Sequence, residues 1–100
     1  MKRIILRQAY DELNDAVGYY EGEQIGLGLR MLNEINEYIH WIMKNPTVPR
    51  VHKGGYRRVN LKIFPYYIAY IVRGDKLWVL AIAHNHRKPE YWIVRKGEID

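Results

Sequence analysis

The segment FPYYIAYIVRGDKLWVLAIAH, residues 64–84, has the clearest structural pattern in the chain. After Pro65, the residues Ile68, Tyr70 and Val72 alternate along one face of an extended strand. Gly74-Asp75 then suits a two-residue hairpin turn, because glycine readily adopts the positive φ that such turns need. The apolar run that follows the turn indicates a buried strand. The segment therefore predicts two antiparallel strands, over residues 66–73 and 76–84.

The residues before this segment continue the period of two. Apolar and polar side chains alternate over residues 56–64, which predicts a third strand of the same antiparallel meander. Arg58, Asn60 and Lys62 occupy its polar face. Residues 46–55, with two prolines and two glycines, predict the loop that leads into it.

The first half of the chain combines a short strand with helical periodicity. Residues 2–7 predict a strand, and apolar stripes over residues 9–22 and 25–44 predict two helices. Glu12 is expected on the solvent side of the first helix, and Pro46 is expected to end the second because proline disfavours helical angles in the residue before it. A short turn between the helices makes them an α-hairpin.

These elements predict a single α+β domain over residues 1–100. Its order is one strand, an α-hairpin and a three-stranded antiparallel meander, with both helices packed on one face of the sheet. The other face is expected to be partly open and to display Arg58, Asn60 and Lys62. We expect Arg58, Lys62 and Arg87 to line a common groove on that side.

Composition limits the kind of protein. Cysteine is absent, which excludes disulfides and thiolate chemistry, and no apolar run suggests a signal peptide or a membrane span, so we expect a soluble cytoplasmic protein. The net charge of +5 is uneven: residues 1–49 carry five Lys/Arg and seven Asp/Glu, whereas residues 50–100 carry eleven and four. This segregation favours an acidic macromolecular partner.

A cluster of polar and aromatic residues, HNHRKPEYW, follows the last predicted strand. A guanidinium beside an aromatic ring is well suited to phosphate or carboxylate, so this exit is a candidate binding site. The candidate target-binding residues are Arg58, Lys62, His86, Arg87, Lys88, Tyr91 and Trp92.

Structural roles compete with binding at several of these positions. His84 continues the apolar run and is expected to be buried and hydrogen-bonded, and Trp92 is expected to close the edge of the core. A zinc site from His52, His84 and His86 lacks a spacing motif, and no nucleotide-binding fingerprint is present. We therefore expect neither a metal nor a cofactor.

Several short segments in this order resemble the RelE/ParE toxin superfamily. They are Glu12-Leu13, Tyr19-Tyr20-Glu21, Gly26-Leu27-Gly28, Arg57-Arg58, Phe64-Pro65-Tyr66, Ile68-Ala69-Tyr70 and residues 79–84. Arg87, Pro89, Tyr91 and Trp92 resemble the ParE branch in particular. The resemblance extends over residues 2–95.

The resemblance implies a toxin of a bacterial type II toxin–antitoxin system, bound and neutralised by a cognate antitoxin in a hetero-oligomer. In the ParE branch it implies inhibition of DNA gyrase by binding. In the RelE branch it implies a metal-independent endoribonuclease that cuts mRNA on the ribosome, for which the corresponding residues here would be Arg58, Arg87, His86 and Tyr91. A third reading is a non-toxic module that captures its antitoxin and represses a promoter with it.

The RelE-type catalytic pattern is incomplete in this chain. Asn60 stands where that branch has a second lysine, Tyr67 where it has an arginine, and Trp92 where it has a tyrosine. An indole cannot replace a phenol as a proton donor or acceptor. The residues therefore favour binding to gyrase over cleavage of RNA.

Overall fold

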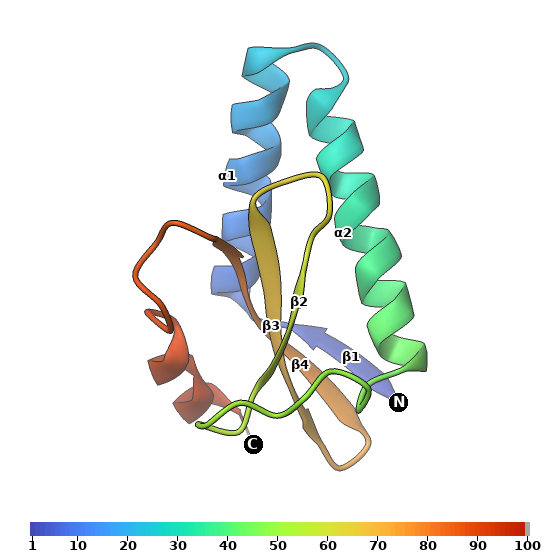
Figure 1. Cartoon of the computed structure of the whole chain (residues 1–100), viewed down its shortest axis with the longest axis vertical. Coiled ribbons are helices and arrows are strands. Elements are labelled where there is room, and N and C mark those ends of the chain that lie inside the picture. Colours follow the sequence, from blue (N-terminus) through green and yellow to red (C-terminus); the bar gives the residue numbers. More distant parts are fainter. Residues whose placement is uncertain (100) are drawn as a thin grey trace.

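The computed structural model describes residues 1–99 as a sheet flanked by a helical hairpin and a short C-terminal helix (Figure 1). The elements are β1 (Lys2–Ile5), α1 (Arg7–Glu23), α2 (Leu27–Lys44), β2 (Arg57–Asn60), β3 (Tyr66–Arg73), β4 (Lys76–His84) and the 3₁₀-helix η1 (Ile93–Glu98). None of the helices in this part of the chain has the length and apolarity that crossing a bilayer requires.

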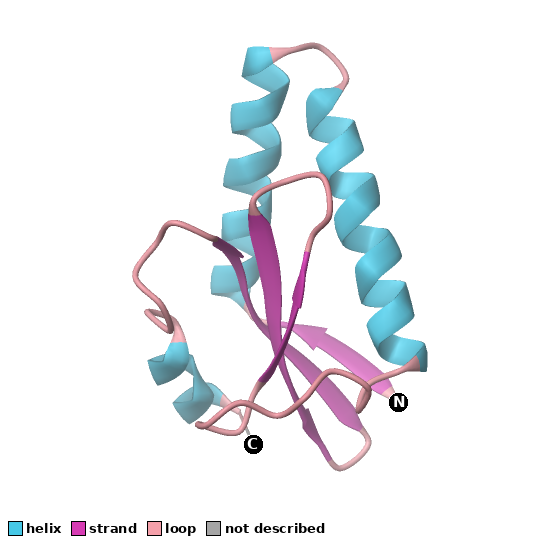
Figure 2. Cartoon of the chain, viewed as in Figure 1, coloured by secondary structure: helices cyan, strands magenta, loops and turns pink. Residues whose placement is uncertain are grey.

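The four strands form one mixed sheet in the order β1-β4-β3-β2 (Figure 2). β2, β3 and β4 pair antiparallel, and β1 pairs parallel with the first half of β4. Gly74 makes the β3–β4 turn with φ of 63°. The predicted α+β class, element order and three-stranded meander are confirmed.

Both helices cover the same face of the sheet, as predicted. Ala9, Leu13 and Ala16 of α1 pack with Met31 and the isoleucines of α2 against the side chains of β3 and β4 on this face. The two helices also approach each other closely where α2 begins. There, the carboxylate of Glu21 accepts hydrogen bonds from the N–H groups of Gly26 and Gly28.

The outer face of the sheet, away from the helices, is covered rather than open. Residues after β4 fold back across it, so that Trp92 and Ile99 pack on the strands. The buried residues of this second core are Leu6, Tyr56, Tyr67, Ala69, Ile71, Trp78, Leu80, Ala81, Ala83, Trp92 and Ile99. The prediction of a partly open face is therefore wrong for most of the sheet, although Asn60 of β2 remains exposed.

Two strands are shorter than predicted. β1 ends at Ile5, because α1 begins at Arg7. β2 ends at Asn60, because the buried carboxylate of Glu34 in α2 accepts hydrogen bonds from the backbone N–H groups of residues 62, 63 and 64. These amides are thereby committed to a turn instead of a strand.

An irregularity in β4 changes which side chains face the helices. Ala69 pairs with Ala81 but Tyr70 pairs with Val79, so Leu80 is an extra residue in the ladder. Leu80 consequently belongs to the outer core, whereas Ile82 belongs to the helix-side core. Leu80 and Ile82 therefore face opposite sides of the sheet, although both belong to the apolar run that His84 continues.

Candidate functional site

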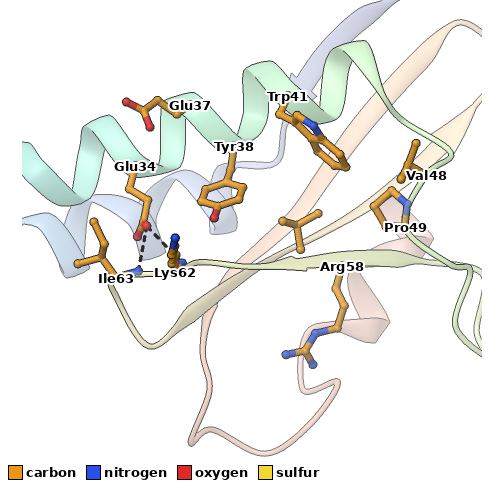
Figure 3. A pocket seen from close by; sticks show the side chains of 10 residues that line it. Glu34, Glu37, Tyr38, Trp41, Val48, Pro49, Arg58, Lys62 and Ile63 are labelled. Atoms are coloured by element: carbon orange, nitrogen blue, oxygen red, sulfur yellow. Dashed lines mark hydrogen bonds between the residues drawn. The ribbon is translucent and has the colours of Figure 1, made fainter.

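A wide hollow lies between α2 and the edge strand β2, and we call it the α2–β2 groove (Figure 3). Its volume is about 580 Å³. Glu34, Glu37, Tyr38 and Trp41 line it from α2, and Val48, Pro49, Arg58, Val59, Lys62 and Ile63 line it from the loop and β2. The groove is thus largely apolar, with carboxylates on the helix and cations on the strand side.

Arg58 extends from β2 away from α2, toward the outer face (Figure 3). Its guanidinium carbon lies 3.6 Å from the centroid of the Tyr67 ring, and its nitrogens donate hydrogen bonds to the side chain of Asn60, the shorter at 2.8 Å. Stacking and hydrogen bonding hold this cation in one orientation at the rim of the groove. Its position on the outer face agrees with the polar alternation of β2.

The segment after β4 presents a second set of cations. His86, Arg87 and Lys88 are all exposed. The guanidinium carbon of Arg87 lies 4.0 Å from the centroid of the Tyr91 ring. The half-buried His84 accepts a hydrogen bond at Nδ1 from the N–H of His86, at 3.0 Å. His84 is therefore hydrogen-bonded, as expected, but not fully buried.

Arg87 and Tyr91 line a different hollow, of about 290 Å³, beside α1. We call it the α1–β4 hollow; its other lining residues are Glu12, Asp15, Ala16, Tyr19, Tyr66, Ile82 and His84. It shares no lining residue with the α2–β2 groove. The expected common groove of Arg58, Lys62 and Arg87 is therefore not formed, and the cations fall into two separate groups.

Trp92 lies inside the outer core and not on a binding surface. Its side chain is 1% exposed, and its indole N–H donates a hydrogen bond to the hydroxyl of Tyr67 at 2.9 Å. Its ring also packs edge-on against Tyr56. The expectation that Trp92 closes the core is confirmed, and this burial removes it from the residues available to a partner.

Polar side-chain contacts anchor the segment after β4 to the rest of the molecule. Glu90 has a φ of 59°, unusual for a residue with a side chain, and accepts a hydrogen bond from the hydroxyl of Tyr56 at 2.6 Å. Burial and this hydrogen bond raise the pKa of Tyr56 to about 12. Lys96 in turn bonds to the carbonyl of Gly54.

Glu12 makes several contacts near Arg87, and the expectation that it faces solvent is wrong. Its carboxylate accepts hydrogen bonds from the Tyr91 hydroxyl, from both terminal nitrogens of Arg95 and from the N–H of Ile82. Burial raises the pKa of Tyr91, and the hydrogen bond to Glu12 raises it further. No periodicity marks this position, because its partners lie some 70 to 83 residues later in the chain.

Histidine and carboxylate side chains do not converge on a metal site in residues 1–99. No group of three or more His, Asp or Glu side chains in this range is arranged to hold an ion. His52 instead stacks on Tyr56, with ring centroids 4.9 Å apart.

Comparison with known proteins first defines the type of fold. A solved structure described as the chromosomal ParDE toxin–antitoxin system from P. aeruginosa is similar, with a TM-score of 0.71 at 22% sequence identity. The match covers 84% of this chain and 95% of that one. The chain therefore has the fold of a small protein of a toxin–antitoxin system.

A family model then identifies the branch. The model described as ParE toxin of type II toxin–antitoxin system, parDE, matches residues 4–89. This chain belongs to the ParE toxin family, which confirms the resemblance found in its sequence. Among curated protein sequences, none gives a significant match.

Proposed function

We propose that this chain is the toxin of a ParDE pair, that it inhibits DNA gyrase by binding, and that a cognate antitoxin neutralises it in a cytoplasmic hetero-oligomer. The family match over residues 4–89 carries this proposal. The arrangement of the exposed cations and of the apolar groove supports a mechanism in which the surface binds macromolecules.

The α2–β2 groove is the surface that we assign to the antitoxin. Trp41, Val48 and Ile63 are large apolar residues that remain exposed there, with 40%, 67% and 53% of their surfaces accessible. β2 is an edge strand, since its pairing partner is β3 alone. An extended segment could therefore bury these side chains and also hydrogen-bond to the strand.

Charge favours an acidic segment in this groove. Lys62 lies on the strand side of the groove and Arg58 at its rim, in the half of the chain where Lys/Arg outnumber Asp/Glu by eleven to four. An antitoxin segment with acidic residues flanking an apolar core would complement both features. The bound segment would also cover Arg58 and Lys62, to which we assign contacts with the target.

The second group of cations supports contact with gyrase or its DNA-bound complex. Arg87 is held over Tyr91, and His86 and Lys88 are exposed beside it. A guanidinium stacked on a ring loses little freedom when it pairs with a carboxylate or phosphate. We assign target contacts to His86, Arg87, Lys88 and Tyr91, with Arg58 and Lys62 as a second contact region.

Endoribonuclease activity is the alternative function, with Arg58, Arg87, His86 and Tyr91 as its candidate catalytic residues. Two observations favour binding over this alternative. Arg58 and Arg87 line different hollows, whereas cations that stabilise one phosphorane must reach the same phosphate. The Tyr91 hydroxyl is bonded to Glu12, and its raised pKa makes it a poorer proton donor at neutral pH.

Expression without antitoxin tests the proposed target. Plasmid supercoiling and mRNA integrity would be measured in the same bacterial culture after induction of the wild-type chain and of Arg87→Ala. We expect loss of negative supercoiling with intact mRNA, and a weaker effect for Arg87→Ala. Codon-specific mRNA cuts with normal supercoiling would contradict the proposal and support the alternative. Normal growth with both readouts unchanged would favour the non-toxic module.

The assignment of the groove has a separate test. Trp41→Ala removes an exposed ring from the α2–β2 groove. Val94→Ala is the control: Val94 lies on η1, outside the groove, and its side chain is 81% exposed. We expect the antitoxin Kd to rise roughly tenfold or more for Trp41→Ala and less than twofold for Val94→Ala. Equal Kd values for the two variants would place the antitoxin elsewhere.

A further inference from the structure

Glu12 is a partly buried carboxylate to which the proposed function gives no role. It lies on α1 with its side chain 15% exposed, and it pairs with Arg95 at 2.9 Å. The guanidinium of Arg95 also donates a hydrogen bond to the carbonyl of Leu80 at 3.0 Å. The ion pair therefore joins three separate parts of the chain: α1, β4 and η1.

The same pair completes the hydrogen bonding of β4 beyond its partner strand. β1 pairs with β4 only from Lys76 to Val79. Further along, the N–H of Ile82 donates to Glu12 and the carbonyl of Leu80 accepts from Arg95. Two side chains thus satisfy backbone groups that a longer β1 would otherwise have bonded.

The hydroxyl of Tyr91 connects this pair to the exposed cations. It donates a hydrogen bond to the carboxylate of Glu12, and the ring of the same tyrosine lies under Arg87. The guanidinium carbon of Arg95 lies 5.5 Å from that ring centroid. The orientation of the Tyr91 ring, and with it the platform for Arg87, is therefore set from the position of Glu12.

We infer that Glu12 is a positioning residue, which holds Tyr91 and Arg95 so that Arg87 is presented to the target in a fixed orientation. This inference rests on the proposed function, in which Arg87 contacts the target. Tyr91 and Arg95 follow residue 89, where the match to the family ends, so the contacts of this chain alone assign them this role.

The chemistry of this site requires a carboxylate. Both oxygens of Glu12 are used, one by Ile82 and Arg95 and the other by Tyr91 and Arg95. In Glu12→Gln one oxygen becomes an NH₂ group, which cannot accept the hydrogen bonds that Arg95, Ile82 and Tyr91 donate, and the negative charge that pairs with Arg95 is lost. The substitution therefore loosens Tyr91 while preserving the size and shape of the side chain.

Asp15→Asn is the matched control. Asp15 lies on the same helix, lines the same hollow and is exposed, so the substitution removes one negative charge without removing a bond to Tyr91. Tyr91→Phe is the complementary variant, since it keeps the ring under Arg87 but removes the hydroxyl that binds Glu12.

The first measurement needs no target. Protons of the Arg87 side chain in the free protein should show ring-current shifts from Tyr91 in the NMR spectrum. We expect these shifts to shrink toward random-coil values in Glu12→Gln and Tyr91→Phe and to persist in Asp15→Asn. Unchanged Arg87 shifts in a folded Glu12→Gln protein would overturn the inference. If Glu12→Gln does not fold, unchanged Arg87 shifts in Tyr91→Phe would overturn it instead.

The second measurement is a double-mutant cycle on inhibition of purified gyrase. We expect Glu12→Gln to raise the concentration for half-maximal inhibition roughly five- to tenfold in the wild-type background, and less than twofold when Arg87 is already alanine. An equal effect in both backgrounds would show a purely structural role and contradict the inference. If the wild-type chain leaves gyrase active, the proposed target is wrong, and the NMR comparison still decides the positioning role.

Discussion

Replacement of Glu34 by alanine should destabilise the protein more than any exposed substitution in the α2–β2 groove. Glu34 is 6% exposed, and it accepts hydrogen bonds from the N–H groups of Lys62, Ile63 and Phe64 at 3.2, 2.9 and 3.3 Å. Hydrogen bonds to a charged group contribute about 1.5–3 kcal/mol each, but the values are not additive. We expect Glu34→Ala to lower the free energy of unfolding by about 3–5 kcal/mol.

This loss is large for a domain of 100 residues, whose total stability is on the order of 5–15 kcal/mol. Urea unfolding monitored by tryptophan fluorescence would measure it, and hydrogen exchange at residues 62–64 would locate it. Glu37→Ala is the control, because Glu37 is exposed on the same helix and lines the same groove; its effect should stay within about 0.5 kcal/mol. A loss below about 1 kcal/mol for Glu34→Ala, or unchanged exchange at these amides, would refute the role of this carboxylate in the turn.

Two further predictions concern the helix-side core. A Cβ at Gly28 would lie 2.6 Å from the carbonyl oxygen of Val17, so Gly28→Ala should lower the free energy of unfolding by about 1–3 kcal/mol. Gly18 has open space around it, so Gly18→Ala should raise the free energy of unfolding by up to about 1 kcal/mol. Similar melting temperatures for the two variants would contradict the close contact between the helices at Gly28. Burial raises the pKa of Tyr70 to about 12 from 10.0. The unfolded chain therefore loses this proton first, and stability should fall as pH rises from about 10 to 12. In urea unfolding at a series of pH values, the free energy of unfolding should fall less steeply with pH for Tyr70→Phe than for the wild type. Identical slopes for the two proteins would show that Tyr70 does not cause the fall.

The strands and helices were predictable because each has a strong period. The outer core was missed because residues 85–99 show no such period, yet β3 and β4 contained a signal. Ile71, Trp78 and Ala81 are apolar on the face that was expected to be open. Nearly continuous apolar strands are typical of a sheet that is covered on both faces.

The accessibility of the cations was easier to predict than their arrangement. Arg87 is an exposed cation on an aromatic ring, as its sequence context indicated, whereas the stacking of the partly exposed Arg58 on Tyr67 was not predicted. Their separation into two hollows depends on the path of the C-terminal segment, which long-range contacts such as Glu12 with Arg95 determine. A contact across 83 residues leaves no local pattern in the sequence.

Titration of the purified chain into a gyrase supercoiling reaction would test directly whether this protein inhibits gyrase. We expect dose-dependent loss of supercoiling, reversal by the antitoxin, and a weaker effect of Arg87→Ala at equal concentration. Full supercoiling at a large molar excess of folded wild-type protein would contradict this expectation.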